Sequence, residues 1–123
     1  MNALKFTIPL NPVTKKNSQQ IIFVKGRRIP IPSKVYRQYE ENAAWFLPKT
    51  GTISSPVNIK ATYYMKTKRR VDLCNLHEAL HDVLVKYQII EDDNCNIVVS
   101  TDGSRVLYDK ENPRTEVEIT GVE

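Results

Sequence analysis

A helix over residues 73–87 is the strongest structural signal in the chain. Its apolar side chains recur at offsets 0, 3, 7, 10, 11 and 14, which is the pattern of one buried helical face. The apolar positions are Leu73, Leu76, Leu80, Val83, Leu84 and Tyr87. Such a helix needs an apolar partner, and residues 57–65 just before it alternate in the way that predicts a β-strand.

The other elements follow from turn residues and alternation. Ser33 is a good N-cap for a helix over residues 34–47, which stops before Pro48. We expect one apolar stripe on that helix, made of Val35, Tyr39, Ala43 and Phe46. We expect further strands over residues 3–9, 20–24, 27–31, 97–100, 106–108 and 115–119.

This order of elements predicts an α+β fold with one mixed β-sheet and two main helices. The chain has 123 residues, which suits a single compact domain over residues 1–123. No apolar run approaches the ~20 residues of a membrane span, and the first residues lack a signal-peptide stretch. We therefore expect a cytoplasmic protein without a membrane partner, and reduced thiols at Cys74 and Cys95.

Charge is divided unevenly along the chain. Residues 1–70 carry fourteen Lys or Arg and two acids, whereas residues 71–123 carry four Lys or Arg and twelve acids. The basic part is typical of a surface that follows nucleic-acid phosphates, by shape rather than by sequence. The candidate DNA contacts are Lys15, Lys16, Arg27, Arg28, Lys68, Arg69 and Arg70.

The carboxylates stand on both sides of the strong helix. Asp72 directly follows the basic residues 68–70, and the pair Asp92-Asp93 comes after the helix. A helix of about fourteen residues is ~21 Å long, so the two groups meet only if the chain folds back or if another subunit supplies one of them. Within the helix, Asn75, Glu78 and Asp82 share one flank.

Two interpretations of these carboxylates stay open at this point. In the structural one, Asp72 caps the helix, Asp82 pairs with Lys86 four residues later, and Asp92-Asp93 closes a turn. In the chemical one, the carboxylates hold Mg²⁺, which prefers hard oxygen ligands together with substrate phosphate. The basic residues would then hold the DNA backbone.

Several segments together resemble the RusA family of Holliday-junction resolvases. The resemblance rests on the string Arg69-Arg70-Val71-Asp72-Leu73-Cys74-Asn75-Leu76, the following helix, and Ile90-Glu91-Asp92-Asp93. Residues 8–17 and 113–117 also resemble the family's first strand with its basic loop and its last strand. The resemblance implies a homodimeric endonuclease of bacterial or phage origin. Such enzymes cut four-way DNA junctions symmetrically in recombination and repair, with Mg²⁺ or its substitute Mn²⁺ and without a small-molecule cofactor.

The same resemblance assigns roles to residues. Asp72 matches the family's first catalytic aspartate, Asp92 and Asp93 match the acidic pair after the helix, and Asn75 matches a supporting asparagine. Asp93 rather than Asp92 is the expected metal ligand.

Two positions depart from the family pattern. Cys74 stands where an aspartate is usual, and a thiol is a poor ligand for Mg²⁺. Glu78, which replaces a frequent lysine, lies four residues later on the same face of the helix. We therefore expect Asp72, Asp93 and Glu78 to be the metal ligands, and these three with Asp92 to be the catalytic residues. The alternative is a catalytically weakened dimer that binds junctions.

A different metal site also has to be considered. Cys74, His77 and His81 fall at offsets 0, 3 and 7 of the helix, and Cys95 follows it. Two thiols and two imidazoles would suit a tetrahedral Zn²⁺ site. The simpler interpretation is two exposed histidines on a solvated face.

Overall fold

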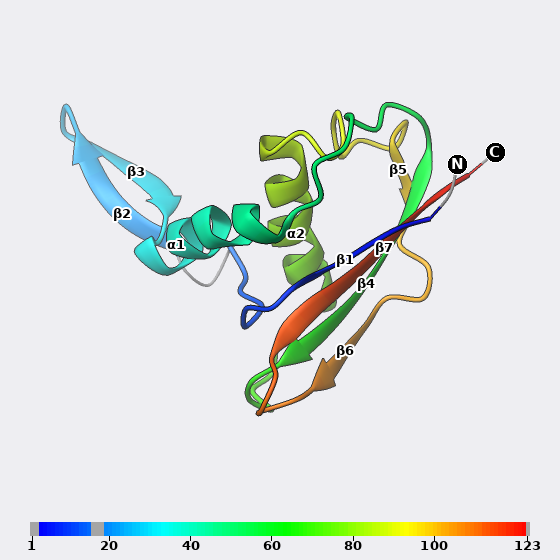
Figure 1. Ribbon diagram of the computed structural model, residues 1–123. Helices are drawn as coiled ribbons and strands as arrows, with labels where there is room; N and C mark the ends of the chain where they lie inside the picture. Colours follow the sequence, from blue (N-terminus) through cyan, green and yellow to red (C-terminus); the bar gives the residue numbers. More distant parts are fainter. Residues whose placement is uncertain (1–2, 16–18, 123) are drawn as a thin grey trace.

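The computed structural model describes residues 3–15 and 19–122 (Figure 1). The described strands are β1 (Leu4–Ile8), β2 (Gln19–Val24), β3 (Arg27–Pro32), β4 (Val57–Met65), β5 (Val98–Ser100), β6 (Arg105–Tyr108) and β7 (Arg114–Gly121). The helices are α1 (Lys34–Ala43), a short 3-10 turn η2 (Ala44–Phe46) and α2 (Leu73–Lys86). The expected α+β fold with a mixed sheet and two main helices is therefore confirmed.

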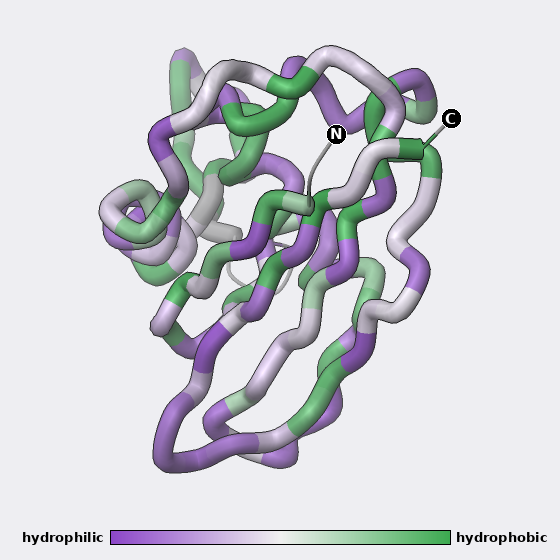
Figure 2. Tube along the Cα trace, turned by 45° about the vertical axis from the view of Figure 1, so that its right-hand side comes forward, coloured by the Kyte–Doolittle hydropathy of each residue, from purple (hydrophilic) through white to green (hydrophobic). Residues whose placement is uncertain are grey.

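The main sheet is built around β4. Its strand order is β1-β7-β4-β5, and β6 also pairs with β4. β7 is antiparallel to both β1 and β4, whereas β5 and β6 run parallel to β4. Hydrophilic and hydrophobic residues alternate along the strands (Figure 2), because successive side chains point to opposite faces of the sheet.

Both helices lie on one face of this sheet (Figure 1). The side chains of α2 that point to the core are fully buried, as are the inward residues of β4 and β7. The main members of this core are Ile59, Ala61, Tyr63, Leu76, Leu80, Val83, Leu84, Val117 and Ile119. Burial of each large apolar side chain contributes roughly 1.5–3 kcal/mol, so the α2–sheet interface dominates the packing energy.

The first helix differs from the expectation in which face it buries. Ser33 accepts a hydrogen bond from the Tyr36 backbone N–H at 3.1 Å, which confirms the predicted N-cap. Val35 is 62% exposed, however, and Tyr36 takes its place in the core. The Tyr36 hydroxyl donates to the Ala79 carbonyl at 3.3 Å, and this contact joins α1 to α2. Phe46 is half exposed because α1 ends at Ala43.

Strands β2 and β3 form a separate two-stranded sheet, so the expected single sheet does not include the hairpin. Figure 1 shows this hairpin projecting from the body of the protein beside α1. Among the described residues, no helix has the length and apolar character to cross a membrane.

Candidate active site

Asp72 lies at the N-terminal end of α2 with its carboxylate exposed. The Asp72 carbonyl accepts hydrogen bonds from the backbone N–H groups of Asn75 (3.1 Å) and Leu76 (3.2 Å). Asp72 is therefore the N-cap residue of α2, as predicted, but its carboxylate accepts no hydrogen bond from the helix backbone. The Asn75 amide donates to the carboxylate at 3.4 Å. The carboxylate is thus held by a neighbour and open to solvent.

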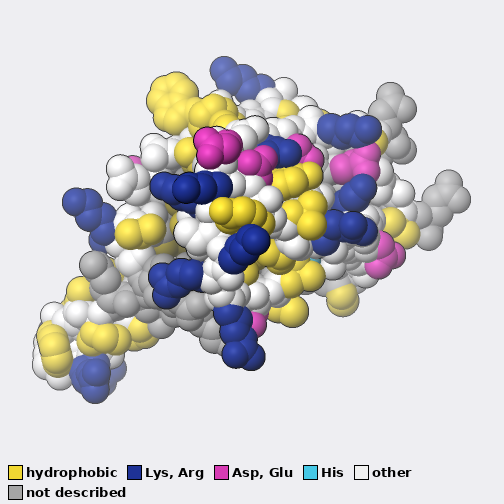
Figure 3. Space-filling view, turned by 90° about the horizontal axis from the view of Figure 1, so that it is seen from below, with side chains coloured by type: hydrophobic (Ala, Val, Ile, Leu, Met, Phe, Trp, Pro, Cys, Tyr) yellow, Lys and Arg dark blue, Asp and Glu magenta, His cyan; other side chains and the backbone are white. Residues whose placement is uncertain are grey.

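A basic loop leads directly to Asp72. Lys68, Arg69 and Arg70 are exposed in the connection between β4 and α2. The Lys68 ammonium lies 5.0 Å from the centre of the Tyr108 ring, which gives that side chain a cation–π contact. Figure 3 shows Lys and Arg side chains spread across the lower face of the molecule and on the projecting hairpin. The positive charges of residues 68–70 and the exposed carboxylate of Asp72 are therefore adjacent at the start of α2.

The other predicted DNA contacts are dispersed. Arg27 and Arg28 are exposed at the start of β3, in the hairpin. Lys15 lies in the loop after β1 and contacts α2, as described below. Lys16 lies outside the described residues.

The acidic turn gives its two aspartates different surroundings. The Asp92 carboxylate accepts hydrogen bonds from the Asp93 backbone N–H (2.8 Å) and from the Asn94 amide (3.0 Å), so Asp92 closes the turn. Burial raises the pKa of the Asp93 carboxyl, and the carboxylates of Asp92 and Asp82 raise it further. Asp92 therefore has a structural role in the turn, whereas Asp93 is influenced by the charge of Asp82 in α2.

The chain reverses immediately after α2. Gln88 has a positive φ of 60°, and the backbone N–H of Ile89 bonds back to the Leu84 carbonyl at 2.8 Å. This reversal brings Asp93 within electrostatic reach of Asp82. Asp82 is ten residues beyond Asp72 in the helix. That separation corresponds to about 15 Å along the axis.

One chain therefore does not gather the predicted metal ligands Asp72, Glu78 and Asp93 around one point. Within residues 3–15 and 19–122, no three His, Cys, Asp or Glu side chains are arranged to hold a metal ion. Glu78 is exposed, with Cys74 four residues before it and Asp82 four residues after it. The carboxylates of α2 thus follow one flank of the helix, from Asp72 towards the acidic turn.

An ion pair between Lys15 and Asp82 was not anticipated from the sequence. The Lys15 ammonium and the Asp82 carboxylate are 2.6 Å apart, and each side chain is about a third exposed. The hydrogen bond to Asp82 raises the pKa of Lys15, with smaller contributions from the charges of Asp82, Glu78 and Glu40, against a lowering by burial. Lys86 pairs with Glu40 of α1 instead. The expected Asp82–Lys86 pair is therefore wrong, because each residue has a partner on another segment.

The histidines are not exposed, and they do not join the cysteines. The Tyr63 hydroxyl and His77 Nδ1 are 2.7 Å apart, and the rings of His77 and His81 stack at 5.5 Å. His81 is only 9% exposed, and its burial next to His77 lowers its pKa to about 4. Cys74 and Cys95 are both exposed free thiols. The zinc hypothesis and the expectation of a solvated histidine face are therefore both wrong for the described residues.

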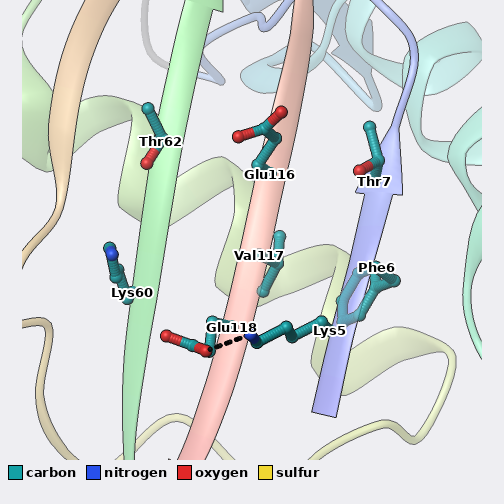
Figure 4. A pocket seen from close by; sticks show the side chains of 8 residues that line it. All are labelled: Lys5, Phe6, Thr7, Lys60, Thr62, Glu116, Val117 and Glu118. Atoms are coloured by element: carbon teal, nitrogen blue, oxygen red, sulfur yellow. Dashed lines mark ion pairs between the residues drawn. The ribbon is translucent and has the colours of Figure 1, made fainter. Parts of the chain in front are cut away.

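A hollow on the opposite, uncovered face of the sheet contains none of the predicted site residues (Figure 4). It lies over β1, β7 and β4 and is lined by outward-facing side chains of both charges. Among them, Lys5 and Glu118 form an ion pair at 3.3 Å. The hollow is thus a mixed polar surface rather than a part of the candidate site.

An exposed basic loop that runs directly into an exposed carboxylate is an arrangement that can hold a phosphate beside a cation. The family model for endodeoxyribonuclease RusA matches residues 9–120 of the chain. The chain therefore belongs to the RusA endodeoxyribonuclease family. No curated protein shows a significant match.

Membership of this family implies Holliday-junction resolvase nuclease activity, and with it the binding of branched DNA. Nucleases of this kind generally use divalent metal ions.

Proposed function

We propose that the protein is a Mg²⁺-dependent endonuclease that resolves four-way DNA junctions by paired symmetric cuts, with Mn²⁺ as a substitute ion. It would act in recombination and repair, in the bacterial cytoplasm where its DNA lies. The observation that carries the proposal is the direct succession of the exposed residues 68–70 and the uncapped carboxylate of Asp72. The cations would hold a phosphate at the point where the carboxylate can bind an ion.

The donor chemistry of the chain fits Mg²⁺. Asp72, Glu78 and Asp93 offer carboxylate oxygens, the hard ligands that this ion prefers. A bound Mg²⁺ would polarise the phosphodiester and lower the pKa of the attacking water. Asn75 would hold the Asp72 carboxylate in place through its amide, and Asp92 would keep the acidic turn closed.

We further propose that the working form is a homodimer. Within the described residues of one chain, Asp72, Glu78 and Asp93 form no group that could hold a metal ion, and a second copy would supply the missing ligand. A four-way junction also offers two equivalent cutting positions, which a two-fold dimer matches with two sites.

The test uses a synthetic four-way junction and a linear duplex made from the same arm sequence. Each is incubated with the protein in Mg²⁺, in Mn²⁺ and in EDTA. We expect symmetric nicks in the junction, in the presence of either metal and not in EDTA. Equal cutting of the duplex, or binding that does not depend on salt concentration, would contradict the proposal.

The second candidate function is a weakened enzyme that binds junctions without efficient turnover. The exposed thiol of Cys74, between Asp72 and Asn75, is the observation that favours it. Replacement of Cys74 by Asp adds a hard ligand, so Cys74→Asp should raise Mg²⁺-dependent cleavage if the natural site is weak. Cys95→Asp, at the other exposed thiol, is the matched control.

Glu78 decides between the two candidates. If it replaces the missing aspartate, Glu78→Gln should abolish cleavage while junction binding remains. Unchanged cleavage in Glu78→Gln would show that Glu78 is only a solvated helix residue. That result, together with a strong gain from Cys74→Asp, would favour the weakened enzyme.

A further inference from the structure

The hairpin β2–β3 is an isolated arm. Its strands pair with each other and, in the described part of the chain, with no strand of the main sheet. Lys25 and Gly26 form the tight turn, with positive φ values of 51° and 76°. An isolated two-stranded hairpin is at best marginally stable in water, so contact with a partner would stabilise it.

The arm exposes apolar side chains next to cations. Phe23 is 70% exposed, more than Ile21, Ile22 and Val24 of the same strand, and its cross-strand partner is Arg28. Directly opposite residues of an antiparallel pair lie on the same face, so the phenyl ring and the guanidinium share one face of the arm. Lys25 and Arg27 are also exposed at the tip.

This combination favours DNA over a second copy of the chain as the occupant. Three cations within four residues of the tip attract phosphate, whereas they repel the equivalent tip of another copy. An aromatic ring beside them can stack on a base, because every base has a π-face. Apolar side chains inserted between bases are a known way for proteins to open a stack.

We propose that Phe23 is a wedge that stacks against a base at the branch point of a DNA junction, with Lys25, Arg27 and Arg28 on the flanking phosphates. The inference rests on the proposed function, since it assumes branched DNA as the substrate. A branch point interrupts the continuous base stack, so insertion there costs less than insertion into a linear duplex. Phe23 would therefore determine selectivity for the junction rather than general affinity for DNA.

The experiment compares Phe23→Ala and Phe23→Trp with the wild-type protein, in EDTA so that the DNA stays intact. Affinity is measured for the junction and for a linear duplex, and 2-aminopurine at the branch point reports unstacking. We expect Phe23→Ala to weaken junction binding on the order of ten-fold or more, with duplex binding unchanged and the 2-aminopurine response lost. Phe23→Trp keeps the ring and should retain both properties.

Trp45→Ala is the matched control, because Trp45 is 85% exposed and lies outside the hairpin, in η2. Both Ala variants should melt at the wild-type temperature, since neither ring is buried. Equal loss of affinity for junction and duplex in Phe23→Ala would overturn the wedge, as would an unchanged 2-aminopurine response. So would dissociation of a dimer by Phe23→Ala in sedimentation, which would make Phe23 a subunit contact. Failure of the wild-type protein to prefer the junction would instead contradict the proposed function itself.

Discussion

Charged groups lie at both ends of helix α2, but among the residues that the structure describes only those of the C-terminal half form ion pairs within the protein. At the N-terminal end, the structure shows no ion pair between Asp72, Arg69 or Arg70 and any residue that it describes. In the C-terminal half, Asp82 is paired with Lys15, and Lys86 with Glu40. His81, also in that half, is buried beside His77.

The difference separates function from stability. Charges that remain in water at the N-terminal end are free to bind phosphate or a cation. Charges that pair within the protein join α2 to the loop after β1 and to α1, and are already satisfied. Changes in the first half should therefore alter DNA cleavage without altering stability, and changes in the second half should do the reverse.

Asp72→Asn should have the largest effect. Loss of one carboxylate from the proposed Mg²⁺ site removes several kcal/mol of transition-state stabilisation, so junction cleavage should fall about a thousand-fold. Junction binding should stay the same or improve, because a charge that repels DNA is removed. The melting temperature should not change, since the Asp72 carboxylate does not cap the helix.

Cleavage rate, junction affinity and thermal melting are measured on the same preparation of Asp72→Asn. The control is Asp102→Asn, at an exposed aspartate outside the predicted site. Normal cutting by Asp72→Asn would contradict a role of the N-terminal end of α2 in DNA cleavage.

The buried His81 should make the second half sensitive to acid. Its pKa is lowered to about 4 by burial, whereas an unfolded histidine titrates near 6.5. Between these pH values the unfolded state binds a proton at His81 that the folded state does not bind. The contribution of neutral, buried His81 to the free energy of unfolding is therefore fully present above about pH 6.5 and is lost as the pH falls towards 4. The loss amounts to about 3 kcal/mol at most.

Chemical denaturation at several pH values measures how the free energy of unfolding changes with pH. His81→Leu should reduce this dependence between pH 4 and 6.5. The comparison of slopes remains valid even if the variant is less stable throughout. Identical slopes in the two proteins would show that burial of His81 is not the source of acid sensitivity.

Arg69→Ala should have a smaller effect, confined to DNA. One lost phosphate contact should weaken binding several-fold and reduce the slope of log affinity against log salt by roughly 0.9. The melting temperature should stay unchanged, because Arg69 is exposed. Lys49→Ala, at an exposed lysine outside the predicted DNA surface, should change neither quantity. An unchanged salt slope in Arg69→Ala would remove the loop from the DNA interface.

Local patterns predicted the elements well. The strand over residues 57–65 has the expected bounds, α2 ends within one residue of its expected end, and Ser33 caps α1. These features depend on alternation, helical periodicity and turn chemistry, all of which act between residues close in sequence. The carboxylates and the basic loop at the start of α2 were also recognisable, because they are consecutive.

Contacts between distant segments were not predictable in the same way. Lys15 and Asp82 are 67 residues apart, so no local spacing pairs them. The two histidines were expected on a solvated face of the helix. Periodicity along the helix does not show that the Tyr63 hydroxyl of β4 forms a hydrogen bond with His77. In α1, the apolar stripe predicted burial of Val35, whereas the structure buries Tyr36 and places its hydroxyl against the Ala79 carbonyl of α2.

The Lys15–Asp82 pair should give the smallest effect and the sharpest test of the comparison. Partly exposed ion pairs contribute about 0.2–1 kcal/mol, so a double-mutant cycle with Lys15→Met and Asp82→Asn should give a coupling energy of about 0.5 kcal/mol in unfolding. Asp82→Asn should leave cleavage close to the wild-type rate. Because Asp82 already neutralises the ammonium, Lys15→Met should reduce the salt slope of DNA binding less than Arg69→Ala does. The opposite outcome is that Lys15→Met reduces that slope as much as Arg69→Ala does, with a coupling energy of zero. Lys15 would then contact DNA rather than stabilise the fold, and the assignment of DNA cleavage to the first half of α2 and stability to the second half would be wrong.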